Sequence, residues 1–148
     1  MKKLLLTLLA STVAAGALIG GTAGTAQAAV GSKCNSWTKV HSSGLWARTC
    51  IEWDGTSWDR GYIEFSNTSG SASNVRLSID LSEHAWGYTI GSNSKIKAVQ
   101  NGETVKVYTP WIADNHYGPE RAIGIVVINP NTDYYLVKDA GVVHEPLF

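Results

Sequence analysis

The chain has 148 residues, and its 12 basic and 12 acidic side chains give a formal net charge of zero. Because the chain has no excess of positive charge to attract phosphate groups, we expect no nucleic-acid partner. Beyond residue 28, no apolar stretch approaches the roughly 18 residues needed to cross a bilayer. The composition therefore argues against a membrane-spanning domain and against a membrane partner.

Residues 1–28 have the arrangement of a secretory signal peptide. Two lysines give a positive start, residues 4–19 form an apolar run, and Ala26-Gln27-Ala28 matches a small-x-small cleavage site. Removal of this segment and its two lysines leaves 120 residues (148 − 28) with 10 basic and 12 acidic side chains, a net charge of −2. We expect a secreted, extracellular protein with one domain over residues 29–148.

Cys34 and Cys50 are the two cysteines of the chain. In an exported protein such a pair is expected to form a disulfide, and closing a loop of about 16 residues contributes roughly 3 kcal/mol. A metal site would need histidines at ligand spacing, which the four histidines do not show. We therefore expect one structural disulfide, no metal and no other cofactor.

Alternation of apolar and polar residues dominates the rest of the chain, and no segment has helical spacing over three turns. The clearest strand is residues 74–81, in which every second residue is Val, Leu or Ile. The segments that we expect to form strands are Leu45–Trp53, Tyr62–Ser66, Asn74–Leu81, Lys95–Gln100, Glu103–Thr109, Ala122–Ile128 and Tyr134–Lys138. Seven or eight short strands predict an all-β fold, a single antiparallel β-sandwich.

Two connections matter for the argument. Residues 54–61 are expected to link the first two strands. Asn101-Gly102 lies between two predicted strands and is the pair that best tolerates the positive φ angles of a type I′ turn. The sequence therefore predicts that residues 95–100 and 103–109 pair as a hairpin.

Residues 128–134, Ile-Asn-Pro-Asn-Thr-Asp-Tyr, resemble the Leu-x-Pro-x-Thr-x-Tyr tyrosine corner of fibronectin type III domains, with Ile in place of Leu. In that family the Tyr hydroxyl bonds back to the backbone and pins a turn between strands. The resemblance implies an immunoglobulin-like or fibronectin III-like sandwich and implies no function. The chain is also similar in style to small exported proteins of Gram-positive bacteria, especially actinobacteria, that carry one short disulfide loop and no assigned activity.

Aromatic residues are concentrated near the predicted first hairpin, where Trp37, Trp46, Trp53 and Trp58 fall within 22 positions. Strand parity places Ile51 and Trp53 on the core face, with Ile63 and Phe65 opposite them. The other face then carries Trp46, Arg48, Cys50, Glu52, Tyr62 and Glu64. Aromatic rings beside charged groups suit a sugar, whose C–H faces stack on the rings while its hydroxyls bond to the polar groups.

A structural interpretation of the same residues stays open. Cys50 shares the outer face, so a disulfide to Cys34 would draw the N-terminal segment across that face. Trp37 would then cover Trp46 and form a second small core. Under this interpretation only Trp58, in an otherwise polar connection, is expected at the surface.

Glu52 and Glu64 raise the question of catalysis. If Ile51 pairs with Phe65, these two carboxylates lie opposite each other, about 5 Å apart at Cβ, which is close to the separation in a retaining glycosidase. Arg48 and Arg60 are near enough in sequence to neutralise both. We therefore do not favour an enzyme.

The favoured function is a secreted, non-catalytic binding module for a polysaccharide or an extracellular protein. Its expected binding residues are Trp46, Arg48, Glu52, Trp58, Tyr62 and Glu64. The alternative is a secreted protein inhibitor or interbacterial effector that presents the loop from Cys34 to Cys50, or residues 111–117, to its target. A small glycan hydrolase is the least favoured, and the sequence does not define an oligomeric state.

Overall fold

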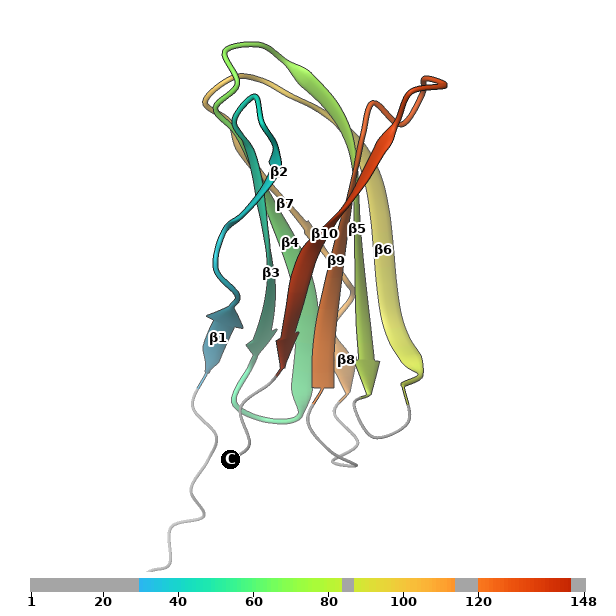
Figure 1. The fold of residues 1–148 in the computed structure, drawn as a ribbon. Coiled ribbons are helices and arrows are strands. Elements are labelled where there is room, and N and C mark those ends of the chain that lie inside the picture. The colour runs from blue at the N-terminus through green and yellow to red at the C-terminus, as the bar shows by residue number, and fades with distance from the viewer. Residues whose placement is uncertain (1–29, 84–86, 114–119, 145–148) are drawn as a thin grey trace, which may run out of the picture.

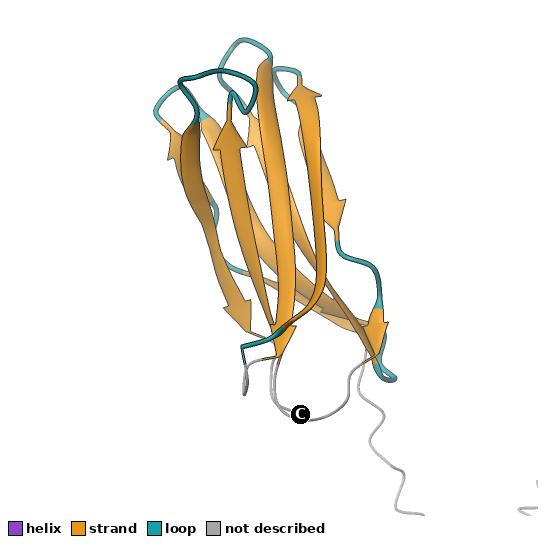
Figure 2. Ribbon diagram, turned by 90° about the vertical axis from the view of Figure 1, so that its right-hand side faces the viewer, coloured by secondary structure: helices purple, strands orange, loops and turns teal. Residues whose placement is uncertain are grey.

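The computed structural model describes residues 30–83, 87–113 and 120–144, and within these ranges the chain forms strands and no helix (Figure 2). The strands are β1 (Gly31–Cys34), β2 (Thr38–His41), β3 (Leu45–Trp53), β4 (Trp58–Asn67), β5 (Ser73–Glu83), β6 (Thr89–Val99), β7 (Thr104–Tyr108), β8 (Ile112–Ala113), β9 (Glu120–Ile128) and β10 (Leu136–His144). Accordingly, no helix in the described ranges is a candidate membrane span. The predicted signal peptide lies outside the described residues.

The strands form two antiparallel sheets that pack face to face (Figure 1). Sheet A has the order β1-β3-β4-β7, with β2 also paired to β3 and β8 to β4, and sheet B has the order β10-β9-β5-β6. The predicted all-β antiparallel sandwich is therefore confirmed. The ten strands exceed the seven or eight expected because β1, β2 and β8 are short additions at the edges of sheet A.

Period-two alternation builds the core between the sheets. On β5, Val75, Leu77, Ile79 and Leu81 are fully buried, while the residues between them face away from sheet A. Ile63 and Phe65 of β4 and Val126 of β9 are also fully buried in this core. At about 25 cal/mol per Å² of apolar area, this burial is the main stabilising contribution to the fold.

The first hairpin is tighter than the sequence predicts. β4 begins at Trp58 rather than Tyr62, so the connection covers residues 54–57 instead of 54–61. The Asp54 carboxylate accepts hydrogen bonds from the backbone N–H groups of Thr56 at 2.8 Å and Trp58 at 3.3 Å. An Asp that bonds its own turn in this way closes the hairpin early. Trp58 is thus a strand residue, not a loop residue.

The predicted hairpin around Asn101-Gly102 is wrong. β6 pairs with β5 in sheet B, whereas β7 pairs with β4 in sheet A. Gly102 has a φ of +82° and Asn101 does not have a positive φ, so the turn is not of type I′. The two residues carry the chain from one sheet to the other, and Gly102 N–H donates to the Asn67 carbonyl of β4 at 2.6 Å.

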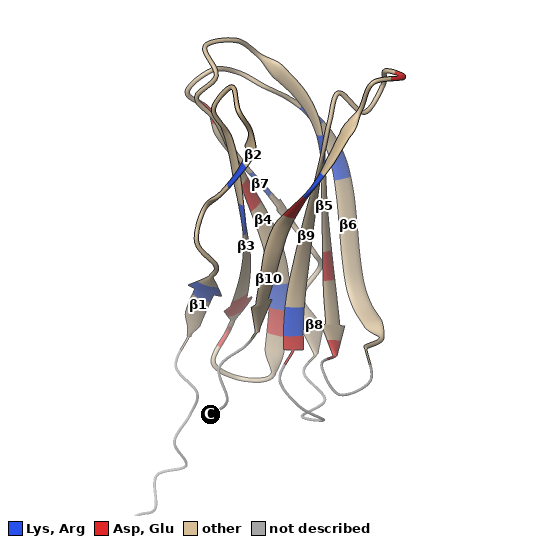
Figure 3. Ribbon diagram, in the orientation of Figure 1, with Lys and Arg blue, Asp and Glu red and all other residues tan. Residues whose placement is uncertain are grey.

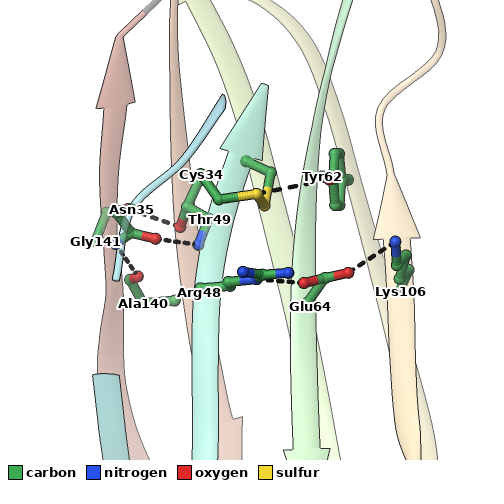
Figure 4. Close-up of a disulfide and its surroundings, with 10 residues drawn as sticks. Cys34, Asn35, Arg48, Thr49, Tyr62, Glu64, Lys106, Ala140 and Gly141 are labelled. Atoms are coloured by element: carbon green, nitrogen blue, oxygen red, sulfur yellow. Dashed lines mark hydrogen bonds and ion pairs between the residues drawn. A yellow bond between two sulfur atoms is a disulfide. The ribbon is translucent and has the colours of Figure 1, made fainter. Parts of the chain in front are cut away.

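The sandwich edge formed by β1 and β10 is joined by the side chain of Asn35. Its Nδ2 donates to the Ala140 carbonyl of β10 at 2.7 Å, and its Oδ1 accepts from the Thr49 N–H of β3 at 2.7 Å (Figure 4). The Thr49 hydroxyl donates to the Gly141 carbonyl at 2.8 Å. These hydrogen bonds connect sheet A to sheet B at an edge where no described strand of one sheet pairs with a strand of the other.

The opposite edge is joined in the same manner. Asn93 of β6 donates through Nδ2 to the Tyr108 carbonyl of β7 at 2.6 Å. Asn67 of β4 is fully buried and donates to the Val99 carbonyl of β6 at 2.8 Å. Buried polar groups cost free energy unless they are paired, and these amides pair with backbone carbonyls across the edge of the sandwich.

We predict that Asn35→Ala lowers the free energy of unfolding by about 2–3 kcal/mol, because two side-chain hydrogen bonds are lost and the carbonyl of Ala140 is left unpaired. Urea denaturation of the purified protein measures this loss. Asn131→Ala, at an exposed loop position, is the matched control and should leave stability within about 0.5 kcal/mol of wild type. Equal effects of the two substitutions would contradict the bridging role.

Candidate functional site

The outer face of sheet A carries most of the charged and aromatic residues that the sequence singles out. The observed register sets Arg48 opposite Glu64 and Cys50 opposite Tyr62. Ile51 and Phe65, on the other face, are fully buried. The predicted division of β3 and β4 into a core face and an outer face is therefore confirmed.

The predicted juxtaposition of Glu52 and Glu64 is wrong. Ile51 pairs with Gly61, not Phe65, so Glu52 lies opposite Arg60 and Glu64 lies opposite Arg48. The early hairpin turn at residues 54–57 causes this shift of four residues. Each carboxylate is ion-paired with the arginine opposite it. The two-carboxylate geometry that a retaining glycosidase needs is absent here.

Glu64 is the centre of a transverse row of charges. Its side chain is 5% exposed and is ion-paired with Arg48 on one side and with the Lys106 Nζ at 2.7 Å on the other (Figure 4). Burial alone would raise the pKa of the Glu64 carboxyl, but the hydrogen bonds from Lys106 and Arg48 outweigh it and hold that pKa below its usual value. The row fixes three strands together and leaves no free carboxylate.

The predicted disulfide between Cys34 and Cys50 is confirmed, and it links directly opposed residues of β1 and β3. Cys50 is fully buried, and the Tyr62 hydroxyl lies 3.6 Å from the Cys34 sulfur. Burial raises the pKa of Tyr62. Because Tyr62 is 5% exposed and Glu64 is 4% exposed, neither presents its side chain to solvent. The disulfide is compatible with an oxidising compartment.

The N-terminal segment does not cross the outer face as the structural interpretation required. β1 lies beside β3 in the plane of sheet A. Trp37 is 38% exposed and its ring lies 4.7 Å from the Arg48 guanidinium carbon. Trp46 is half-buried, with Lys39 Nζ 5.6 Å from its ring centroid. Cations, rather than a second apolar core, cover these tryptophans.

A cluster of aromatic and charged side chains lies on the outer face of sheet A near β8. We call it the platform and define it as Glu52, Trp58, Arg60, Tyr108 and Trp111. The guanidinium carbon of Arg60 lies 4.3 Å from the Tyr108 ring centroid and 4.4 Å from that of Trp111. Glu52 is ion-paired with the same guanidinium. Trp58 is 48% exposed and Trp111 is 40% exposed.

The rigidity of the platform follows from these contacts. A guanidinium held by two rings and a carboxylate loses its freedom to rotate, and its remaining N–H groups keep a fixed direction. The exposed indole of Trp58 adds apolar area on the same face, and Trp111 keeps part of its own ring exposed. The platform therefore offers stacking surfaces and directed polar groups at one place.

Tyr108 and Trp111 are platform residues that the sequence argument did not place in the site. The predicted hairpin pairs the segment of Tyr108 with residues 95–100, which belong to sheet B, whereas Tyr108 lies in sheet A. The alternation of Thr104, Lys106 and Tyr108 is the signal that could have found it, because it matches the polar outer face of β4. Trp111 was considered only as part of a possible loop surface.

A scan against protein-family models finds no match for the chain, and no curated protein matches it. The resemblance of residues 128–134 to a tyrosine corner stays a prediction. Tyr134 of that motif is 91% exposed.

We predict that Glu64→Gln reduces the amount by which the free energy of unfolding falls at acidic pH. The native pKa of Glu64 lies below its ordinary value of 4.5, so the unfolded chain binds more protons as the pH falls, and stability decreases through the native pKa. Wild type should therefore lose more stability than Glu64→Gln between about pH 5 and pH 2.

At pH 7 the same substitution should cost about 1–3 kcal/mol, because Arg48 and Lys106 lose their charged partner. Urea titrations at several pH values measure both effects. Glu52→Gln is the matched control, since the side chain of Glu52 is 21% exposed whereas that of Glu64 is 5% exposed. Parallel acid profiles of wild type and Glu64→Gln would refute the prediction.

Proposed function

We propose that the protein is a secreted, non-catalytic binding module that holds a polysaccharide on the platform of sheet A. The observation behind this proposal is the Arg60 guanidinium, which lies against the Tyr108 and Trp111 rings on the same face as the exposed Trp58. Sugar rings present C–H faces to aromatic surfaces and hydroxyls to charged groups, and the platform has both kinds of surface in fixed positions. The predicted signal peptide and the disulfide support an extracellular location.

Of the six binding residues expected from sequence, the proposal keeps Trp58 and Glu52 as platform members. Arg48 and Trp46 lie on the same face, where they stabilise the neighbouring part of sheet A. Tyr62 and Glu64 also belong to this face, but both are buried, Tyr62 under Lys106 and Glu64 between Arg48 and Lys106. Their role is to position strands β3, β4 and β7 rather than to contact the ligand.

The platform favours polysaccharide over the alternative of a protein inhibitor. The segment from Cys34 to Cys50 forms β2 and part of β3 within sheet A, which supports a binding module over an inhibitor that presents this segment as a loop. Most of residues 111–117 lie outside the described residues. A shallow surface also suits an extended polymer better than a small molecule, which needs a concave pocket.

We predict that Trp58→Ala combined with Trp111→Ala reduces retention on insoluble cell-wall polysaccharide by at least about tenfold, because stacking area is lost. Arg60→Lys should weaken retention less, since it keeps the charge but not the planar stacking. Pull-down with chitin, cellulose, xylan and peptidoglycan measures both effects, and thermal unfolding verifies that the variants fold.

Tyr134→Ala removes an aromatic residue that is 91% exposed and remote from the platform, so it serves as the control and should bind as wild type does. Equal retention of wild type and all variants would indicate non-specific adsorption, and an equal loss in Tyr134→Ala would place the binding surface elsewhere; either result would contradict the proposal. Capture of a stoichiometric protein partner with no polysaccharide retained would replace it with a protein-binding function.

A further inference from the structure

The outer face of sheet B is an exposed surface of a different character. β9 places Ile123, Ile125 and Val127 on this face, and β10 adds Val137 and Val142 directly opposite Val127 and Ile123. Val137 is 53% exposed and Val142 is 42% exposed, while the three β9 residues are half-buried. In the described ranges, sheet A covers only the inner face of sheet B (Figure 1). A contiguous apolar stripe of this kind marks an interaction surface.

β5 lies beside this stripe and carries two opposite charges on the same face. Arg76 pairs in register with Val127, Ser78 with Ile125, and Asp80 with Ile123. Arg76 and Asp80 are therefore related symmetrically about the row that contains Ser78 and Ile125. They are four residues apart on one strand, about 13 Å, which is too far for them to pair with each other.

We propose that this face binds a second copy of the chain, in a two-fold symmetric dimer whose axis crosses the row of Ser78 and Ile125. The axis lies in the plane between sheet B of one copy and sheet B of the other, and it runs perpendicular to the strands. It therefore places β5 of one copy antiparallel over β5 of the other. Each Arg76 then faces an Asp80, each Val127 faces an Ile123, and Ile125 faces its own copy. The face is thus complementary to itself in both charge and apolar pattern, as a symmetric interface requires.

The β6 edge of sheet B argues for face-to-face rather than edge-to-edge association. On β6, Lys95 and Lys97 share the face of the buried Leu77 and Val75, and both are exposed (the blue band on β6 in Figure 3). Charged residues that point inward on an edge strand discourage the pairing of further strands. The outer face has no such protection along β9.

The expected dimer is weak. The face measures about 19 Å across four strands and about 24 Å along seven residues, or about 450 Å² in projection. A standard interface buries about 800 Å² on each partner, so we expect a dissociation constant on the order of 100 µM. One group opposes the dimer. Asp139 of β10 pairs with Ile125 of β9, so the Asp139 carboxylates of the two copies lie near each other at the axis and repel.

Sedimentation of the purified protein between about 10 µM and 1 mM tests the proposal. We expect reversible dimerisation. Ile125→Lys should raise the dissociation constant at least about tenfold, because two like charges meet on the axis. Asp139→Asn should lower it about threefold or more, because the repulsion is removed while the Asn oxygen still accepts the Gly141 N–H that Asp139 accepts at 2.6 Å.

A charge exchange provides the sharpest test. Arg76→Asp and Asp80→Arg should each weaken self-association about tenfold, since each places like charges opposite one another. An equimolar mixture of the two variants should associate again, because one copy then carries two acids and the other two arginines. The double variant should also self-associate as wild type does. Circular dichroism verifies that each variant folds.

A chain that stays monomeric up to about 1 mM would overturn the proposal. So would a dimer that is unaffected by Ile125→Lys, or one in which the mixed variants do not recover, since such a dimer uses another surface. The proposal does not rest on the platform, which lies on the opposite side of the sandwich. The polysaccharide proposal and the dimer proposal can therefore be refuted independently of each other.

Discussion

The structure depends on closing the open edges of a two-sheet sandwich, and amide side chains do so. Apolar packing holds two sheets together but is not directional, so it does not by itself fix their relative shift. At one edge, Asn35 connects β3 to β10. At the other edge, Asn67 of β4 bonds to β6, and Asn93 of β6 bonds to β7. The disulfide fixes Cys34, the residue before Asn35, to Cys50 of β3 and thus holds the amide where it can reach both sheets.

The outer face of sheet A illustrates how a strand surface rich in charge can be largely self-satisfied. Glu64 lies between two cations, Tyr62 lies under Lys106, and Trp46 lies beside Lys39. Such contacts stabilise the face but leave little of it for a ligand. The platform differs because its tryptophans retain exposed area while its arginine is already ordered, so a ligand would not have to order it on binding.

Local patterns in the sequence were sufficient to predict β3, which runs from Leu45 to Trp53 as expected, and the alternation of β5 around Leu77. The same patterns do not define which strands pair. Asn101-Gly102 favours a turn in either a hairpin or a crossing between sheets, and the choice depends on β5, whose backbone already pairs with β6. The register of β3 and β4 depended on the carboxylate of Asp54, which shortened the turn and separated Glu52 from Glu64.

The position of the acceptors of Asn35 has a consequence for how the chain reaches its native state. Asn35 lies near the start of the domain, but Ala140, whose carbonyl it bonds, lies 105 residues later on the last strand. A polypeptide that emerges from a ribosome or a translocation channel N-terminus first can pair β1, β2 and β3 early, yet its amide finds no acceptor until β10 arrives. Completion of the N-terminal edge is therefore a late, long-range step, and the nascent chain stays open until nearly all of it is available.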